Sequence, residues 1–351
     1  MEKVTIFIDG ANFYNLVLKK LGSRELYFDF DAFAHFLANG RKIVEMGKRF
    51  YIGAVSEQND DPKSKEAMSN QTALFNILKK SGWELKTSKL RKRFEEIIID
   101  NRVVDFQEIQ KRGIYAIQYQ RLREKGIDVK IATDLIVGAV DDKYDTAIVV
   151  SSDGDLLPAI DWVTKRKQKK IEYIGFSILD EEDERKSTKP LLSMISKTDI
   201  QRTLIVSDLK PFLQVPISNK KLFQKVKELD LPLGRYALFG SAPMGVRGLK
   251  ECQDIDIIVN KELWDKFSKK LEWEKKKSID SGSEYLQNND IELWKDWKAG
   301  ARVWDIENLI SEAEIIDDLP FVKLERVLEW KKSNGRNKDI KDLKIIKIFT
   351  R

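Results

Sequence analysis

Two short, mostly apolar segments in the first half of the chain run directly into turns that contain aspartate and glycine. Residues 4–8 lead into Asp9 and Gly10, and residues 147–150 lead through two serines into Asp153. Short apolar runs bounded by turn residues are typical of strands that are covered on both faces. Helical patterns alternate with these strand patterns, which predicts an α/β fold with a mainly parallel sheet and helices on both sides.

The same patterns give an expected order of elements for the first region. We predict strands at residues 4–8, 49–55, 146–150 and 170–176, the last being the final clear strand, with strands or a charged hairpin within 83–106. The predicted helices cover residues 12–20, 31–38, 63–80, 128–140 and 158–165. Residues 57–61 and the acidic stretch 177–189 are expected to be loops, the second one flexible, and residues 190–213 to pack back on this region.

The length of the chain predicts two domains. At 351 residues with 42% apolar content, the chain exceeds one ordinary core, and we place the domains at residues 1–213 and 217–351. The second region shows a helix at 219–228, strands at 236–239 and 254–259, a strand pair at 284–286 and 291–294, and helices at its end. This order predicts a smaller α+β domain.

The composition narrows the classes of function. A net charge of +6 and a pI near 9.0 favour polyanionic partners such as RNA. The only histidine, His35, excludes chemistry that needs a histidine pair, and the only cysteine, Cys252, excludes an internal disulfide and a cysteine-based zinc site. No apolar run reaches the ~20 residues of a membrane span, and we expect no signal peptide, so a reducing cytoplasm is the expected location.

Acidic residues mark one edge of the predicted parallel sheet. Asp9 and Asp153 follow strands whose carboxyl ends should meet, with Asp155 close behind. Asp128 and Asp134 lie on one apolar helix, which we expect to be buried nearly all round, so that Asp134 would need a cation to offset its charge. Carboxylates gathered in this way are suited to two Mg²⁺ or Mn²⁺ ions that activate water against a phosphodiester.

Local structural roles are the alternative for each of these residues. Asp9 and Gly10 would form only a turn, Asn12 and Asp128 would cap helices, and Asp153 and Asp155 would be ordinary loop residues. The sequence leaves these alternatives open for each residue alone, whereas the set as a whole favours a shared site.

Three segments resemble the signature blocks of the NYN domain, a LabA-like family related to PIN nucleases. They are residues 6–14 (IFIDGANFY), 125–135 (KGIDVKIATDL) and 149–156 (VVSSDGDL), within a region of about residues 1–213. The resemblance implies a Rossmann-like fold and a metal-dependent ribonuclease. It implies metal binding by Asp9, Asp134 and Asp153, support from Asp128 and Asp155, and a substrate-orienting role for Asn12. A leucine follows Asp155 where the family often has phenylalanine.

Two clusters of basic residues are candidates for contacts with RNA phosphates. The first comprises Lys86, Lys89, Arg91, Lys92 and Arg93, and the second comprises Lys165, Arg166, Lys167, Lys169 and Lys170. Solvated helix and strand faces are the alternative. Phe94, Tyr115 and Tyr119 could stack on bases of a single strand, with packing in a core as the competing interpretation.

The second region has its own pair of carboxylates. Asp254 and Asp256 flank one residue of a predicted strand and should therefore share a face. Together with the upstream Gly240 and Ser241, they resemble the core of DNA polymerase β-type nucleotidyltransferases over residues 217–351. The resemblance implies that Gly240 and Ser241 hold a nucleoside triphosphate, that Asp254 and Asp256 bind Mg²⁺, and that Glu292, chosen over Asp290, is the third acid.

Three functions follow as hypotheses. The first is a Mg²⁺- or Mn²⁺-dependent endoribonuclease tethered to a nucleotidyltransferase-like domain. The second is a nucleotidyltransferase that acts on RNA ends or on a protein hydroxyl, with the first domain as its RNA-binding module. The third is an RNA-binding regulator without catalysis. The number of subunits is left open.

Overall fold

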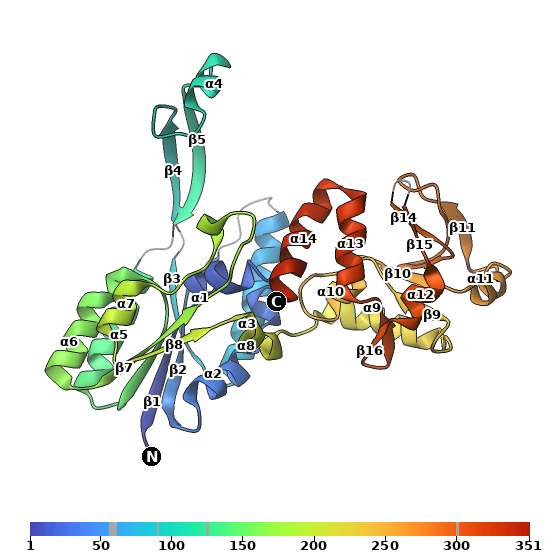
Figure 1. The fold of residues 1–351 in the computed structure, drawn as a ribbon. Helices are drawn as coiled ribbons and strands as arrows, with labels where there is room; N and C mark the ends of the chain where they lie inside the picture. Colours follow the sequence, from blue (N-terminus) through green and yellow to red (C-terminus); the bar gives the residue numbers. More distant parts are fainter. Residues whose placement is uncertain (56–61, 90, 124–125, 300–301) are drawn as a thin grey trace. The chain divides into compact units, whose positions relative to one another are not determined.

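The computed structural model describes residues 1–55, 62–89, 91–123, 126–299 and 302–351 (Figure 1). The predicted loop at 57–61 lies outside these residues. The chain forms two compact units, and each unit is assembled from three separate segments of the sequence. Unit 1 contains residues 1–13, 34–174 and 191–202, and unit 2 contains residues 14–33, 175–190 and 203–351. The linear division at residues 213–217 stays a prediction.

A six-stranded sheet with the order β3-β2-β1-β6-β7-β8 forms the centre of the first unit's fold. Its strands from β3 to β7 pair in parallel, as the sequence predicted. The expectation that residues 170–176 form the last strand was wrong, because a further strand, β8, joins the edge. The strands are β1 (Lys3–Asp9), β2 (Lys42–Ala54), β3 (Glu84–Lys89), β6 (Thr146–Val150), β7 (Lys170–Phe176) and β8 (Ile200–Leu204).

Helices flank this sheet. On one side, Ile131 and Leu135 of α5 and Ile160 of α6 pack in one buried cluster with Phe7 and Val149 of the sheet. The expected helix at 12–20 is instead a short helix, α1, followed by a π-helical turn at Tyr14–Leu18. The helices in this part of the chain are α1 (Gly10–Phe13), α2 (Phe30–Ala38), α3 (Pro62–Lys80), α5 (Ile127–Val140), α6 (Leu157–Lys167) and α7 (Leu192–Lys197).

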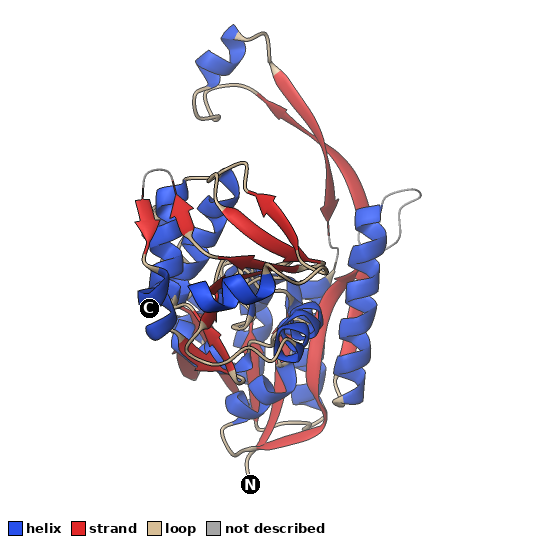
Figure 2. Ribbon diagram, turned by 90° about the vertical axis from the view of Figure 1, so that its right-hand side faces the viewer, coloured by secondary structure: helices blue, strands red, loops and turns tan. Residues whose placement is uncertain are grey.

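A separate two-stranded antiparallel ribbon lies between β3 and α5 in the sequence (Figure 2). It consists of β4 (Arg91–Ile98) and β5 (Ala116–Arg123), and the short helix α4 (Phe106–Lys111) lies between them. Residues 83–106 thus contain strands, as one of the two expectations stated, but the hairpin alternative was wrong. The partner of β4 begins only at Ala116, because α4 and its flanking turns intervene.

Unit 2 is built on a seven-stranded mixed sheet with the order β11-β12-β13-β10-β9-β17-β16. This second, sheet-rich domain matches the predicted α+β character. Its strands are β9 (Tyr236–Leu238), β10 (Ile255–Val259), β11 (Glu274–Lys277), β12 (Glu284–Asn288), β13 (Ile291–Trp294), β16 (Glu314–Ile316) and β17 (Leu319–Phe321), and β14 (Trp297–Ala299) pairs with β15 (Arg302–Trp304). Its helices are α8 (Val206–Leu209), α9 (Ile217–Glu228), α10 (Ala242–Gly245), α11 (Lys261–Phe267), α12 (Ile306–Ser311), α13 (Leu324–Asn334) and α14 (Asn337–Phe349).

The acidic loop at 177–189 belongs to unit 2, where ion pairs hold it. Glu182 pairs with Lys344 at 3.0 Å and with Lys347 at 3.1 Å, both on α14. Several charge-assisted contacts restrict a loop more than the polar sequence suggested. In the described parts of the chain, no helix combines the length and the apolar composition that a bilayer crossing requires.

Candidate functional site

The parallel pairing of β1 with β6 brings two acidic turns to one edge of the sheet. Ile8 lies opposite Val150, so Asp9 and the turn Ser151–Asp153 leave neighbouring strands at the same end. Parallel strands present their carboxyl ends together, and this is where ligands gather in open α/β sheets. The structure therefore places Asp9 and Asp153 on one edge, which is where the sequence predicted them.

Asp9 is the most enclosed carboxylate of this edge, with 5% of its surface exposed. One carboxylate oxygen accepts a hydrogen bond from the backbone N–H of Asn12 at 3.0 Å, and the other accepts one from the hydroxyl of Ser151 at 3.3 Å. Burial raises the pKa of Asp9 to about 6, and the carboxylates of Asp128 and Asp153 add to the rise. Asp9 is thus a buried acid surrounded by negative charge.

Asp128 and Asp155 complete this acidic cluster. Asp128 lies in the first turn of α5, directly after Gly126 and Ile127. Burial raises its pKa above the ordinary value, and the carboxylates of Asp153 and Asp155 raise it further. Mutual repulsion of this kind is relieved by a cation. We refer to Asp9, Asp128, Asp153 and Asp155 as the acidic cluster.

Asn12 and Ser151 join the two turns that carry the cluster. The side-chain oxygen of Asn12 accepts a hydrogen bond from the backbone N–H of Ser152 at 3.0 Å. The hydroxyl of Ser151 accepts one from the N–H of Asp153 at 3.3 Å while it donates to Asp9. The sequence had assigned Asn12 to substrate and had given Ser151 no role. The available signal for Ser151 was its position between an apolar strand and an aspartate, and the structure shows that it is buried.

Asp134 corrects two expectations from the sequence. Its helix is not buried all round, because Val129, Val137 and Val140 are 68%, 48% and 50% exposed. Its carboxylate does not lack protein partners: the hydroxyl of Tyr51 donates to it at 2.7 Å. Two cations of the sheet complete its surroundings, Arg49 at 3.8 Å and Lys86 at 3.6 Å. Six residues separate Asp134 from Asp128, which places the two on different faces of a helix.

These contacts reverse the expected effect of neutralising Asp134. If Asp134 needed a cation, as the sequence predicted, Asp134→Asn would stabilise the metal-free protein by removing an uncompensated charge. We now expect a loss of about 1 kcal/mol, because a charge-assisted hydrogen bond and two partly exposed ion pairs weaken. Hydrogen exchange of the α5 amides in EDTA would measure this loss of stability. Faster exchange in the wild type than in the variant would contradict the expectation.

The raised pKa of Asp9 predicts how unit 1 responds to pH without metal. Folding favours the protonated form, so this contribution is complete below pH 3.8 and is lost as the pH rises through about 6. The difference between these values corresponds to about 3 kcal/mol. In EDTA, Asp9→Asn should therefore exceed the wild type in stability at pH 8 and approach it at pH 4.

Hydrogen exchange of the β1 amides at both pH values would test this expectation. Asp161→Asn serves as the control, because the pKa of Asp161 is lowered, chiefly by its hydrogen bond to Lys165. Removing that charge should give no gain in stability at pH 8. An equal gain for both variants would contradict the role of Asp9.

The chemistry of the acidic cluster suits a metal ion, whereas the spacing of its side chains is wide. Carboxylate oxygens are the donors that Mg²⁺ and Mn²⁺ take, and the repulsion within the cluster favours a cation. Within the residues that the structure describes, no three acidic, histidine or cysteine side chains are close enough to form a metal-binding group. The donor set fits a hard divalent cation, provided that the side chains draw closer around it.

The two basic clusters lie differently with respect to these acids. Lys165 lies at the end of α6 and pairs with Asp161 at 2.8 Å. Lys165 is eight residues after Leu157, the first residue of α6, so the helix separates it by ~12 Å from the edge that carries Asp153. Arg93 is exposed on the ribbon, whereas the side chains of Arg91 and Lys92 lie outside what the structure describes.

The aromatic residues of the ribbon are not in a core. Phe94 is 83% exposed and Tyr115 is 65% exposed, which excludes core packing for both. Tyr119 is half-buried, and its hydroxyl donates to Glu95 at 2.8 Å. The ribbon returns to unit 1 only five residues before Asp128, so its root lies within ~17 Å of the acidic cluster.

Unit 2 brings three other carboxylates together. Asp256 on β10 lies directly opposite Glu292 on the parallel strand β13, and Asp254 precedes β10. Burial raises the pKa of Asp256 to about 7, and Asp254 and Glu292 contribute to the rise. Burial and Asp254 also raise the pKa of Glu292. The indole N–H of Trp294 donates to Asp256 at 3.1 Å.

Position 240, beside this group of three carboxylates, requires glycine. Gly240 has a φ of +59°, and a Cβ atom there would lie 1.9 Å from a carboxylate oxygen of Asp256. Hydrogen bonds hold the following loop, which contains Gly245 and Gly248. Asn219, fully buried on α9, donates to the carbonyls of Gly245 and Lys250 and accepts from the N–H of Cys252. The sequence gave no signal for Asn219.

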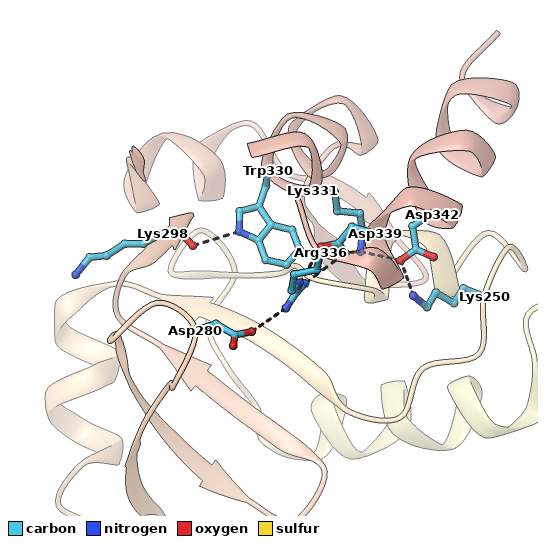
Figure 3. A network of polar contacts seen from close by, with 8 residues as sticks. All are labelled: Lys250, Asp280, Lys298, Trp330, Lys331, Arg336, Asp339 and Asp342. Atoms are coloured by element: carbon cyan, nitrogen blue, oxygen red, sulfur yellow. Dashed lines mark hydrogen bonds and ion pairs between the residues drawn. The ribbon is translucent and has the colours of Figure 1, made fainter. Parts of the chain in front are cut away.

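The three carboxylates line a cavity of about 650 Å³ in unit 2, together with Gly240, Ser241 and several cations. Figure 3 shows the network at its other wall. Lys331, 3% exposed, pairs with Asp339 at 3.1 Å and Asp342 at 2.8 Å. Arg336 binds Asp339 at 2.8 Å, and Lys250 binds Asp342 at 2.5 Å. A cavity with acids on one wall and cations on another suits a ligand that carries phosphates and a metal ion.

Comparisons with known proteins bear on the first of these sites. The NYN domain model matches residues 3–196, more than half of the chain. A solved structure from Vibrio parahaemolyticus RIMD 2210633, described as a protein of unknown function, is similar with 21% sequence identity and a TM-score of 0.35. That match covers 58% of this chain and 93% of the other. No curated protein matches the chain.

Proposed function

The chain belongs to the NYN domain family, and on that premise we propose that it is a metal-dependent endoribonuclease acting on RNA phosphodiester bonds. Membership of the family implies a PIN-like ribonuclease domain and suggests RNA as substrate. The observation that carries the proposal is the acidic cluster, in which the pairing of β1 with β6 sets Asp9 and Asp153 at one sheet edge, and burial, with help from Asp128 and Asp153, raises the pKa of Asp9. Perturbed acids of this kind gather at functional sites.

The residues of the cluster divide into ligands and positioning groups. Asp9, Asp128 and Asp153 would hold the cation, with the exposed Asp155 beside them. Mg²⁺ or Mn²⁺, when bound, would supply Lewis acidity and lower the pKa of a water molecule. Ser151 and Asn12 hold the two turns in register through their hydrogen bonds. Asp134, predicted as a ligand, would have a supporting role because Tyr51 and two cations hold it.

Substrate contacts would come from the root of the ribbon. Arg93 and Phe94 are both exposed there, and they offer a charge for a phosphate and a ring for a base. These two side chains favour a single-stranded RNA substrate that extends from the acidic cluster along the root of the ribbon.

Cleavage of labelled single-stranded RNA by the full chain, with Mn²⁺ and with EDTA, tests the proposal. We expect cleavage only with metal, together with a rise in the melting temperature of unit 1 on adding metal. RNA binding that is sensitive to salt, without any turnover in Mg²⁺ or Mn²⁺, would favour the regulator hypothesis instead. Cleavage that persists in EDTA would contradict metal dependence.

A second candidate function rests on the cavity of unit 2. We propose that this unit is nucleotidyltransferase-like and binds a nucleoside triphosphate with Mg²⁺, with Asp254, Asp256 and Glu292 as the acids. The support is the register of Asp256 with Glu292 and the close approach of Gly240 to Asp256. In such an enzyme the acids would hold the metal, and the turn at Gly240 and Ser241 would hold phosphates.

Incorporation of labelled nucleotide into RNA or protein is the corresponding test. Asp256→Asn should abolish incorporation, and it should leave RNA cleavage at the acidic cluster unchanged. Asp318→Asn, which changes an exposed turn residue, is the control. If neither RNA nor protein accepts label with the wild type, while nucleotide still stabilises unit 2 against heat, the unit would be a binding module.

A further inference from the structure

Among the described residues, the two-stranded ribbon has no third strand, and its tip, where Ile99 is buried, is contacted by the short helix α4. β4 and β5 pair with each other over eight positions and with no other strand in the described parts of the chain. Both strands are therefore edges, and each has a row of backbone groups open to a further strand. A ribbon of two strands is only marginally stable in water unless another surface packs on it.

Large aliphatic side chains are exposed on both faces of the outer half of the ribbon. Ile97 and Ile117 are cross-strand neighbours on one face, 43% and 45% exposed, and Ile98 is 56% exposed on the other. Beyond them, Val104 is 82% exposed. An apolar patch of this kind marks a contact with protein. Aliphatic side chains offer no ring on which a nucleic-acid base could stack.

The charges of the ribbon are divided between its two halves. The root, residues 89–94 and 120–123, contains six Lys and Arg and no acid. The outer half, residues 95–119, contains five Asp and Glu and three Lys and Arg, a net charge of −2. RNA would be repelled from the outer half, whereas the root of another ribbon would be attracted to it. Two ribbons that lie side by side in opposite directions would therefore have complementary charges.

We propose that the outer half of the ribbon is a dimer arm, through which two copies of the chain pair their ribbons antiparallel about a two-fold axis. This arrangement sets the basic root of each copy beside the acidic outer half of the other, while a parallel arrangement would set root on root. The antiparallel arrangement buries the isoleucines near the two-fold axis. It also gives hydrogen-bond partners to backbone groups at the free strand edges, and the same surface of both copies forms the interface. The inference goes beyond the proposed ribonuclease activity and does not depend on it.

Sedimentation equilibrium of the full chain tests the dimer arm. We expect a dimer for the wild type, and a dissociation constant raised about 100-fold or more by the double variant Ile97→Glu/Ile117→Glu. Ile279→Glu, at an isoleucine of unit 2 that is 101% exposed, is the matched control and should remain dimeric. A monomeric wild type, or a double variant that dimerises as well as the wild type, would overturn the proposal.

A charge variant covers the case in which the double variant does not fold. Glu96 is exposed, so Glu96→Lys should fold normally while weakening the dimer about tenfold. Added salt should weaken the wild-type dimer more than the Glu96→Lys dimer. Glu272→Lys, at an exposed residue of unit 2, should have no effect. A monomeric wild type whose RNA binding is lost in the isoleucine variant would identify the outer half as an RNA surface and overturn the dimer arm.

Discussion

Asp9→Asn is expected to lower metal-dependent RNA cleavage by about 1000-fold, or about 4 kcal/mol of barrier, while the metal-free protein becomes more stable at pH 8. Asp9 is the most buried acid of the acidic cluster, and its pKa is raised to about 6 by burial and by two neighbouring carboxylates. Asparagine keeps the size of the side chain and still accepts the hydrogen bond from Asn12. It removes the charge that would hold a cation.

The combination of lost activity and gained stability separates a ligand from a structural residue. Single-turnover cleavage of labelled RNA in Mn²⁺, with hydrogen exchange in EDTA, measures both quantities on one preparation. Asp161→Asn on α6, at a partly exposed acid paired with Lys165, should keep full activity. Full activity of Asp9→Asn would point to a contaminating nuclease. Lost activity with lost stability would assign Asp9 a structural role.

Lys331→Met is expected to destabilise unit 2 by about 3 kcal/mol, because it removes from a buried ion network the one cation that two buried acids share and leaves each acid with a single cationic partner. Lys331 is buried between Asp339 and Asp342 at the wall of the cavity (Figure 3). Burial opposes the charge of Asp339, but Arg336 and Lys331 outweigh it and hold its pKa below the ordinary value. Methionine keeps the volume of the side chain and removes only its charge.

Thermal unfolding of unit 2, followed by tryptophan fluorescence near Trp330, would measure this loss. Lys332→Met changes the next residue, which is exposed, and should stay within about 0.5 kcal/mol of the wild type. Adding Asp342→Asn to Lys331→Met should recover part of the stability, because a buried acid that has lost one of its two cations is then neutral. A loss no larger than that of Lys332→Met would show that the network is neutral for folding.

Local patterns were sufficient for the fold class and for the edge that carries Asp9 and Asp153. Apolar runs that end in Asp-Gly turns specify parallel strands and their ends through contacts between near neighbours in the sequence. The same holds for helix α5 and for the presence of a second, sheet-rich domain. The NYN family match agrees with the blocks that the sequence displayed.

Local patterns were insufficient wherever the partner of a residue lies far away in the chain. Tyr51, 83 residues before Asp134, supplies the hydrogen bond that the sequence could not show. Likewise, the pairing of β4 with β5 depends on a segment that returns after an intervening helix.

The amino-acid sequence by itself determined the central strands β1, β2, β6 and β7 and the aspartates at one sheet edge, because near neighbours in the chain decide strand ends and turns. Only the tertiary structure decided which acids share a cluster, which already have partners, and which apolar side chains stay exposed on the ribbon. Those outcomes depend on which distant segments pack against each other, and the charge and burial of a side chain are set by that packing.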